Sequence, residues 1–387
     1  MRILFYCATP LDELGGAEAS ALLLAEALRR RGHDVGIVES APSRSAQTYA
    51  PPFGGPVWSI PLPTYPARRP WLWRSFLRSM YRFQTVVRTF RPDIVSIQSA
   101  CRQTLPVIGA CALPHRWRLV VTAHGSDIKV YSVEDPTLRM WLSRVFTRAD
   151  AVTAVSKSLL RDLITQYPVA RRRRSQVIHN GIDLSWFDQS HDTPPASQAR
   201  YVLYVGRLEQ IKGVDILLRA WQLFQANVPR VALWLAGDGS AMDDLRALSQ
   251  HLGLAEQVRF LGRIPARDLG ALYRNAELVV MPSRSEGLPL VALEAGGCGT
   301  ICVATRVGGV PEVIEDKVTG FLVDPESPTA LAQVMAGAIR LPLADRRRMG
   351  IAAKERIAQH FSHERTTDAY EELFRSLVVP RATVSQP

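Results

Sequence analysis

The chain has few of the features that mark disulfide-rich or zinc-binding proteins. Its five cysteines are scattered and odd in number, and no pair has the Cys-x-x-Cys spacing; they are Cys7, Cys101, Cys111, Cys298 and Cys302. This use of cysteine argues against a disulfide framework and against a zinc site. It is typical of a protein that works in the reducing cytoplasm.

Sequence patterns that bind divalent metals are also missing. There is no Asp-x-Asp pair anywhere in the chain, and the eight histidines are dispersed except for His360 and His363. Metal sites need several carboxylate, histidine or cysteine ligands at suitable spacing. We therefore expect no metal site, no divalent requirement and no resident cofactor.

Long apolar runs are absent as well. Polar residues interrupt every apolar stretch well before the ~20 residues that span a bilayer. The first residues, Met1–Cys7, lead into Asp12 and Glu13 without a signal-peptide cleavage pattern. The sequence thus predicts a protein that is neither exported nor membrane-spanning.

Acidic residues are scarce in one part of the chain. Residues 41–125 contain 11 basic residues and a single acidic one, Asp93. The net charge of +11 comes entirely from the first half, because residues 1–190 hold 25 Lys or Arg against 14 Asp or Glu, whereas residues 191–387 hold 22 of each. Such a field attracts the first half to an anionic partner, which could be phospholipid, nucleic acid or a phosphorylated acceptor.

Apolar strand patterns alternate with helical patterns through both halves of the chain. A length of 387 residues favours two domains, and the polar stretch Gln189–Arg200, with Pro194-Pro195, is the best linker between them. We predict two doubly wound α/β domains: a first over residues 1–188, a linker over 189–200 and a second over 201–363. The expected strands are Arg2–Ala8, Val35–Val38, Asp93–Ile97, Leu119–Ala123, Ala151–Val155, Tyr201–Val205, Ala232–Ala236, Val258–Leu261, Leu278–Met281 and Ile301–Ala304.

One stretch of the second half combines a strand, a glycine-containing turn and a helix. It follows the apolar run Leu278–Met281 and extends over Pro282–Gly296. Pro289 suits the first helical position, so that the next amides point out of the helix start and make an anion site. Glu286 in the turn and Glu294 in the helix lie eight residues apart, roughly 12 Å along a helix axis, and can hold the two ends of an extended ligand.

A second phosphate-binding pattern follows the strand Tyr201–Val205. Gly206–Gly213 contains Arg207 at the strand end and Lys212 at the start of the next helix. The guanidinium offers a fork to phosphate oxygens, and the lysine adds a point charge. Together with the helix start after Pro289, these cations would neutralise a diphosphate without a metal.

The first half has its own candidates at strand and helix ends. His124 follows the strand Leu119–Ala123, at the edge where parallel-sheet proteins hold ligands, although a single histidine is more often structural. Gly15-Gly16 precedes the helical pattern that runs from Ala17 to Arg31, and glycine at this helix start lets the backbone approach a ligand.

The basic segment before the third strand of the first half predicts an amphipathic helix. Trp73, Phe76, Leu77, Met80, Val87 and Phe90 share one helical face, and Arg74, Arg78 and Arg82 share another. Packing on the sheet is favoured after Met80, whereas membrane contact is favoured for residues 63–73. The expected membrane-contact residues are Arg68, Arg69, Trp71, Trp73 and Arg74.

Several of these motifs together resemble the GT-B glycosyltransferases of family 4 (GT4). The resemblance covers nearly the whole chain and is specific for the superfamily but not for the substrate. The motifs are Gly-Gly-Ala-Glu at 15–18, Asn-Gly-Ile-Asp at 180–183, the Gly-Arg block at 206–213, Ser-Glu-Gly-x-Pro-x4-Glu at 285–294, Gly-Gly-Val-Pro-Glu at 308–312 and Gly-Phe-Leu-Val at 320–323.

The resemblance implies a fold and a set of roles. It implies two Rossmann-like domains facing across a cleft, an N-terminal acceptor domain, a C-terminal nucleotide-sugar domain, and a last helix over about 364–379 that crosses back to the first domain. It implies transfer with retention of configuration, with His124 and Glu286 as catalytic residues. Arg207 and Lys212 would bind the diphosphate and Glu294 the ribose, and the other donor contacts would be Gly16, Gly262, Ile264, Gly287, Leu288, Leu290 and Val291.

The sequence departs from the family pattern after Glu294. Relatives usually have a bulkier residue in place of Gly296 and a proline in place of Ile301. Helix-interior glycines cost roughly 1 kcal/mol each relative to alanine, so we expect the helix to end early, at Gly296.

The resulting hypothesis is a cytoplasmic hexosyltransferase, peripheral on the inner face of the membrane, that uses a nucleoside-diphosphate sugar, with UDP preferred over GDP. Its acceptor would be a hydroxyl of a lipid-linked or cell-envelope glycan. A small soluble acceptor, or a nucleotide-sugar epimerase or phosphorylase on the same architecture, remains an alternative. A basic nucleic-acid binder is disfavoured because no reading motif accompanies the charge. The base, the sugar, the linkage and the oligomeric state stay open.

Overall fold

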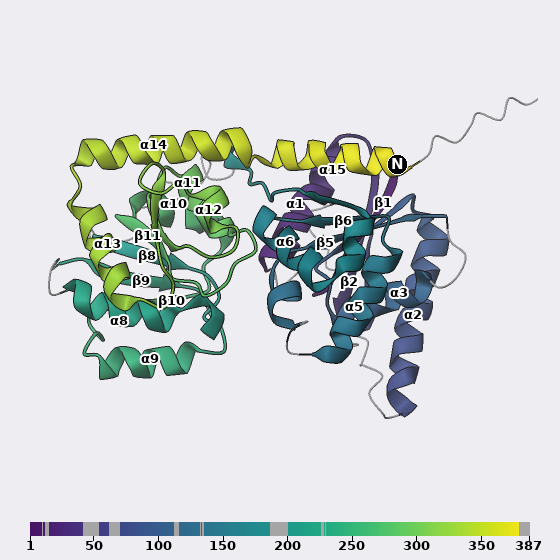
Figure 1. Ribbon diagram of the computed structural model, residues 1–387, viewed down its shortest axis with the longest axis horizontal. Coiled ribbons are helices and arrows are strands. Elements are labelled where there is room, and N and C mark those ends of the chain that lie inside the picture. The colour runs from purple at the N-terminus through teal and green to yellow at the C-terminus, as the bar shows by residue number, and fades with distance from the viewer. Residues whose placement is uncertain are drawn as a thin grey trace, which may run out of the picture. The chain divides into compact units, whose positions relative to one another are not determined.

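The computed structural model describes residues 1–9, 11, 15–41, 54–61, 70–111, 116–131, 133, 135–185, 200–225, 228 and 230–378. The chain divides into two compact units (Figure 1). The first contains Met1–Asn180 together with the residues from His363 onward, and the second contains Gly181–Ser362.

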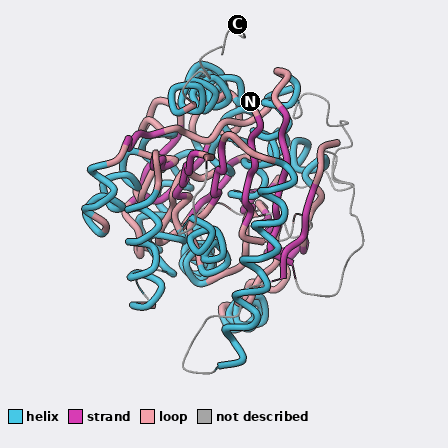
Figure 2. Tube along the Cα trace, turned by 90° about the vertical axis from the view of Figure 1, so that its right-hand side faces the viewer, coloured by secondary structure: helices cyan, strands magenta, loops and turns pink. Residues whose placement is uncertain are grey.

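The first unit is built on a seven-stranded, all-parallel sheet with the order β3-β2-β1-β4-β5-β6-β7. Near-continuous apolar runs form the central strands because both faces of a parallel sheet are covered. Figure 2 shows these strands side by side between layers of helices. The strands are β1 (Arg2–Cys7), β2 (Asp34–Ala41), β3 (Val57–Pro61), β4 (Ile94–Gln98), β5 (Arg118–Ala123), β6 (Ala151–Ala154) and β7 (Arg174–Val177).

Two helices from opposite ends of the chain cover one face of this sheet. The apolar side of α1 (Gly16–Arg30) and the buried Tyr370, Leu373 and Phe374 of α15 (His363–Leu377) share one core with β1, β2 and β4. The resemblance implied a returning helix over about 364–379, and α15 is part of the first unit. The other helices of the unit are α2 (Pro70–Phe90), α3 (Leu105–Cys111), α5 (Pro136–Arg148) and α6 (Lys157–Gln166).

Helix α2 packs differently from the sequence expectation in part. The part after Met80 packs as expected, but its buried residues are Phe83 and Val86, whereas Val87 and Phe90 of the predicted face are only half-buried. Leu77, however, is 50% exposed and lies on the solvent side of the helix with the arginines. Phe76 and Met80 approach Gly109 of α3 closely, so the helix is rotated with these two residues toward α3 and Leu77 toward solvent. Arg68 and Arg69 lie outside the described residues, as do the side chains of Trp71 and Trp73.

The second unit has a six-stranded parallel sheet with the order β10-β9-β8-β11-β12-β13. Helices α8 (Val214–Gln225), α9 (Met242–His251) and α13 (Pro328–Arg340) bury their apolar sides in one core on this sheet, and α10, α11, α12 and α14 lie on the opposite side of it (Figure 1). The remaining bounds are β8 (Tyr201–Val205), β9 (Ala232–Ala236), β10 (Val258–Gly262), β11 (Leu278–Met281), β12 (Cys302–Thr305), β13 (Gly320–Val323), α10 (Ala266–Asn275), α11 (Leu290–Gly297), α12 (Val310–Val313) and α14 (Leu343–His360).

Helix α11 ends within the glycine pair, one residue beyond the predicted end at Gly296. The helix continues to Gly297, and Pro289 precedes it as the N-cap instead of occupying its first position. A Cβ on Gly296 would lie 2.9 Å from Cγ1 of Ile357, and one on Gly297 would lie 2.7 Å from a methyl of Leu184. The glycines therefore let neighbouring chain segments pack closely against α11, which offsets their low helix propensity.

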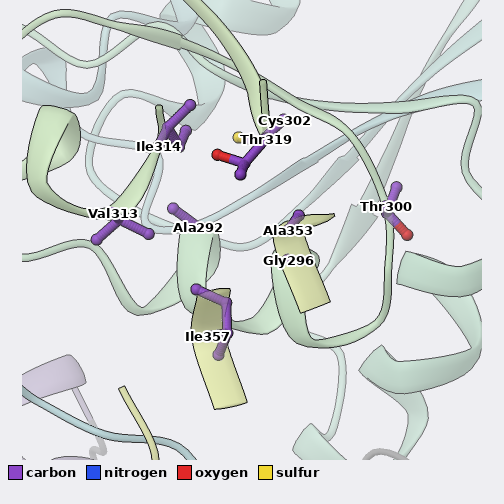
Figure 3. A pocket seen from close by; sticks show the side chains of 9 residues that line it. All are labelled: Ala292, Gly296, Thr300, Cys302, Val313, Ile314, Thr319, Ala353 and Ile357. Carbon is purple, nitrogen blue, oxygen red and sulfur yellow. The ribbon is translucent and has the colours of Figure 1, made fainter. Parts of the chain in front are cut away.

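A small cavity remains beside this contact (Figure 3). Its lining is mostly apolar, from residues such as Ala292, Val313 and Ile357. The hydroxyls of Thr300 and Thr319 are hydrogen-bonded to backbone groups. The cavity is a packing void and not a ligand site.

The boundary between the units falls earlier than the sequence suggested. It lies between Asn180 and Gly181, not at residue 188, because the Ile182 amide donates to the carbonyl of Phe361 and Ile182 pairs with Ser362 in the second unit. Of the expected linker 189–200, residues 189–199 lie outside the described residues.

Within the described residues, none of the helices combines the length and the hydropathy required to cross a bilayer.

Candidate active site

The loops of the second unit meet at the carboxyl edge of its sheet. The strand order reverses between β8 and β11, and in doubly wound folds ligands bind in the crevice at this reversal. The loop after β8 contains Arg207 and Lys212, and the loop after β11 contains Glu286. Both loops thus lie where the topology predicts a ligand.

Close backbone contacts hold these loops together, and glycine is required at several of them. A Cβ on Gly213 would lie 2.1 Å from the carbonyl oxygen of Pro282, and one on Gly308 would lie 1.9 Å from that of Glu286. Both glycines also have positive φ, 65° and 52°, which other residues rarely adopt. The motif glycines therefore set the spacing of the loops.

An ion pair joins the two loops directly. Nζ of Lys212 lies 2.8 Å from Oε1 of Glu286, and the Ser283 hydroxyl donates to the same oxygen at 2.7 Å. The side chains are largely buried, with exposures of 21% and 10%. Two residues predicted from separate motifs are thus brought together.

A second, bidentate pair fixes the loop of Glu286 to helix α8. Arg284 donates from both terminal nitrogens to the Asp215 carboxylate at 2.8 Å. The guanidinium lowers the pKa of Asp215 from its usual value. Asp215 lies in the first turn of α8, so this pair gives the loop a second anchor beside the Lys212–Glu286 pair.

The start of helix α11 has no side-chain cap. The backbone amides of its first turn are therefore available to an anion. Leu290 and Val291 open the helix, and the buried Leu288 precedes it. The Gly287 carbonyl accepts from the Gly309 amide at 3.0 Å, so this loop is supported by its neighbour.

Glu294 lies in α11 beyond its first turn and has a different partner. The Tyr273 hydroxyl donates to Oε2 of Glu294 at 2.6 Å. Burial raises the pKa of this carboxyl, and the tyrosine bond opposes the rise. Sequence reasoning missed Tyr273, which looks like an ordinary core residue of an amphipathic helix.

The remaining donor-site candidates of this unit lie on neighbouring strand ends. Arg207 is half exposed and pairs with Glu209 at 2.6 Å. Gly262, with φ of 70°, ends β10 at a bulge, and its carbonyl accepts from Gly237. Ile264, partly buried, follows in the same loop.

In the first unit, His124 is held by buried polar groups. Its Nε2 lies 3.1 Å from Oε1 of Gln98, whose amide nitrogen donates to Ser96 and Thr122. Asp127 accepts from the backbone amides of Ala100, His124, Gly125 and Ile128. The sequence did not predict a role for Gln98, nor the four backbone amides that donate to Asp127.

Burial lowers the pKa of His124 to about 4. The imidazole is therefore neutral near pH 7 and able to share hydrogen bonds without carrying charge. Helix α1 begins at Gly16, one residue before the predicted start at Ala17, and Glu18 of its first turn is buried. The two units each contain a group of candidate residues at a sheet edge.

No cluster of three or more potential metal ligands occurs among the described residues.

Comparison with known proteins matches two family models to consecutive parts of the chain. The family described as "Glycosyltransferase Family 4" matches residues 14–186, and "Glycosyl transferases group 1" matches residues 187–356.

Curated relatives share about a third of the aligned residues. A D-inositol 3-phosphate glycosyltransferase of Salinispora tropica is 34% identical over 261 residues, which are 62% of this chain and 54% of that protein. The Mycobacterium tuberculosis protein of the same name is 35% identical over 284 residues, 68% of this chain and 58% of the relative. The chain thus aligns with little more than half the length of these relatives.

Solved structures show the same fold at lower identity. Sucrose-phosphate synthase of Thermosynechococcus elongatus superposes with a TM-score of 0.81 at 22% identity, covering 97% of this chain and 98% of that one. The Anabaena protein HepE, solved with UDP and glucose, gives 0.80 at 23% identity, covering 97% and 100%. With two Rossmann-like units, matching family models and these neighbours, the chain belongs to the GT-B glycosyltransferases of family 4.

Proposed function

We propose that the protein transfers a hexose from a nucleoside-diphosphate sugar to an acceptor hydroxyl, with retention of configuration. The observation that supports this most directly is the Lys212–Glu286 pair at the strand-order reversal, next to the uncapped start of α11. This arrangement offers an ammonium and backbone amides to a diphosphate, and a carboxylate to sugar hydroxyls.

The chemistry follows from where charge develops. As the bond between the sugar carbon and the diphosphate breaks, negative charge grows on the leaving group. Lys212, Arg207 and the amides of Leu290 and Val291 would stabilise it, because preorganised donors act most strongly on developing charge. Glu286 would bind sugar hydroxyls near the reacting carbon, and the family resemblance assigns a catalytic role to His124.

UDP is the preferred nucleotide in this proposal. Support comes from HepE, whose solved complexes contain UDP and UDP-glucose. Calorimetry with UDP, GDP and ADP tests the choice. Tightest binding of UDP is expected, and tightest binding of GDP would overturn the preference but not the transferase activity.

The favoured acceptor is a lipid-linked or envelope glycan at the cytoplasmic membrane face. The argument rests on α2, where Leu77 and Tyr81 are 50% and 67% exposed beside the exposed Arg74, Arg78 and Arg82. Exposed apolar and basic side chains on one helix suit an anionic lipid surface.

Flotation with liposomes tests this docking. Binding to vesicles with anionic lipid at low salt is expected, and it should weaken in Arg78→Glu/Arg82→Glu. Arg347→Glu, on the exposed side of α14 in the other unit, is the matched control. Absence of binding to anionic vesicles at low salt would overturn the membrane proposal.

A small soluble, phosphorylated acceptor is the second candidate. The named relatives, D-inositol 3-phosphate glycosyltransferases, favour it, and the basic first unit is compatible with a phosphate. Incubation with a UDP-hexose and either lipid extract or inositol phosphates distinguishes the two. An isomerised donor in the absence of any acceptor would indicate an epimerase instead.

A further inference from the structure

A hydrogen bond between α10 and α11 controls the environment of Glu294. Tyr273 is fully buried, and its hydroxyl donates to Oε2 of Glu294 at 2.6 Å. The backbone carbonyl of Tyr273 accepts from the hydroxyl of Thr300, at 2.7 Å. The phenol is thereby fixed at its backbone and its tip.

This bond determines what Glu294 can offer to a ligand. Burial raises the pKa of Tyr273 well above its usual value, so the phenol stays protonated and acts as a donor. Among the described residues, no donor is bonded to Oε1 of Glu294. One oxygen thus accepts from the phenol, and the other retains the capacity to accept a further hydrogen bond.

We propose that Tyr273 is a positioning residue for nucleotide recognition: it holds Glu294 with Oε1 available to the ribose hydroxyls of the donor. The proposal rests on the proposed function, in which Glu294 binds the ribose. A carboxylate held on one oxygen loses less conformational freedom when its other oxygen binds a ligand. It also remains an acceptor in a site that would otherwise favour protonation.

The alternative is that Tyr273 merely packs between α10 and α11. Its ring would then matter for stability, and its hydroxyl would have no influence on ribose recognition. The two roles predict different affinities. Only in the positioning role does loss of the Tyr273 hydroxyl weaken binding of a nucleotide that has ribose hydroxyls more than binding of one that lacks them.

The experiment compares UDP with 2′,3′-dideoxy-UDP by calorimetry on wild type, Tyr273→Phe and Glu294→Gln. Tyr273→Phe removes the donor and keeps the ring. We expect it to weaken UDP binding about tenfold, in the range of a lost hydrogen bond to a charged group, and to change dideoxy-UDP binding less than twofold. Tyr201→Phe is the matched control, because that buried hydroxyl donates to the Leu272 carbonyl of the same unit and its loss should leave both affinities unchanged.

Each other outcome has a separate meaning. Equal weakening of UDP and dideoxy-UDP in Tyr273→Phe would overturn the positioning role, and so would an unchanged affinity for UDP when Glu294→Gln lowers it. If Glu294→Gln itself left UDP binding unchanged, the assignment of Glu294 to the ribose would fall, and with it that part of the proposed function.

Discussion

Lys212 and Glu286 hold each other at the position where the proposed donor would bind. The ammonium and the carboxylate lie 2.8 Å apart and are largely buried. On donor binding, Lys212 would share its charge with the diphosphate, so its contribution should be larger in the transition state than in the free enzyme.

Lys212→Ala should therefore lower kcat by about 10²–10³-fold, the usual effect of losing one preorganised group that stabilises developing charge. Steady-state kinetics with a UDP-hexose measures it, and circular dichroism checks the fold. Arg219→Ala, which removes an exposed cation of α8 in the same unit, should retain activity. Near-wild-type turnover of Lys212→Ala would remove its role at the phosphates.

His124 should remain neutral through the physiological range. Its pKa is lowered to about 4 by burial, whereas an exposed histidine titrates near 6.5. Between these values the unfolded chain binds more protons than the folded one, so His124 reduces stability as pH falls from about 6.5 to about 4.

An NMR titration of the His124 ring should accordingly show no midpoint between pH 6 and 8. The signal is assigned by its loss in His124→Gln. The exposed His251 supplies an internal comparison in the same spectra. A His124 midpoint near 6.5 would contradict the effect of burial.

At the residue scale, the sequence predicted charged ligands better than their supports. Lys212, Glu286 and Glu294 stand in motifs with unusual glycine and proline, which set them apart from solvated side chains. Tyr273 and Gln98 carry no such mark, because a buried polar residue in an amphipathic helix or strand looks like core. Their role depends on a hydrogen bond to a residue of another element, and the spacing of residues along the sequence does not predict such a contact.

At the scale of the elements, the conformation of the loop around Glu286 depends on the close contact of its backbone with Gly308. Gly308 combines a φ of 52° with a position where a Cβ would lie 1.9 Å from the Glu286 carbonyl oxygen. Because this oxygen belongs to the backbone, it cannot avoid the added methyl group by a side-chain rotation, and the loop itself must move.

Gly308→Ala should thus lower the free energy of unfolding by at least about 2 kcal/mol and weaken nucleotide binding. Thermal unfolding and calorimetry measure the two effects. Gly337→Ala in α13 is the control, because nothing lies within 4 Å of its added Cβ; it should be neutral or stabilising by about 0.5–1 kcal/mol. A neutral Gly308→Ala would show that the loop tolerates displacement.

Ten of the thirteen strands in the described residues, and the α/β order, were predictable from apolar runs, whereas β3, β7 and β13 were not expected as strands. Helix faces were also less predictable. Leu77 was placed on the apolar face of α2 but lies on its exposed side, because the contact with Gly109 of α3 decides the rotation of the helix. Helix α11 ends at Gly297, one residue beyond the predicted end. Propensity disfavours Gly296 and Gly297, but tight packing needs them.

For the molecule as a whole, the docking of α15 in the first unit is sensitive to acid. Glu371 contacts Arg31, His33 and Arg375, and Arg31 in particular lowers the pKa of Glu371 to about 2. A lowered carboxyl pKa contributes stability above its unfolded value, near 4.5, and this contribution is lost as pH falls toward 2.

Glu371→Gln should lower the thermal midpoint at pH 7 by a few degrees, about 2–4 °C per kcal/mol lost, and reduce the difference in midpoint between pH 7 and pH 3.5. The exposed Glu372→Gln is the control and should behave like wild type. An unchanged pH dependence in Glu371→Gln would show that other carboxylates dominate acid unfolding.

The expectation that no divalent metal is required is tested on the intact enzyme. Turnover should persist after treatment with EDTA, since Lys212 and the α11 amides would neutralise the diphosphate. Complete loss of turnover that Mg²⁺ or Mn²⁺ restores would contradict this.

The passage of the chain from the first unit to the second and back has a consequence for the order of folding during synthesis. The second unit is one continuous segment, but the core of the first unit includes Tyr370, Leu373 and Phe374 of α15. At 5–20 residues per second, a ribosome needs roughly 10–40 s to make the residues between Asn180 and Leu377. During that time one face of the sheet in the first unit lacks helix α15. The second unit, although synthesised later, is therefore the first that can complete its fold. Chaperones have this interval in which to bind the exposed apolar face of the first unit.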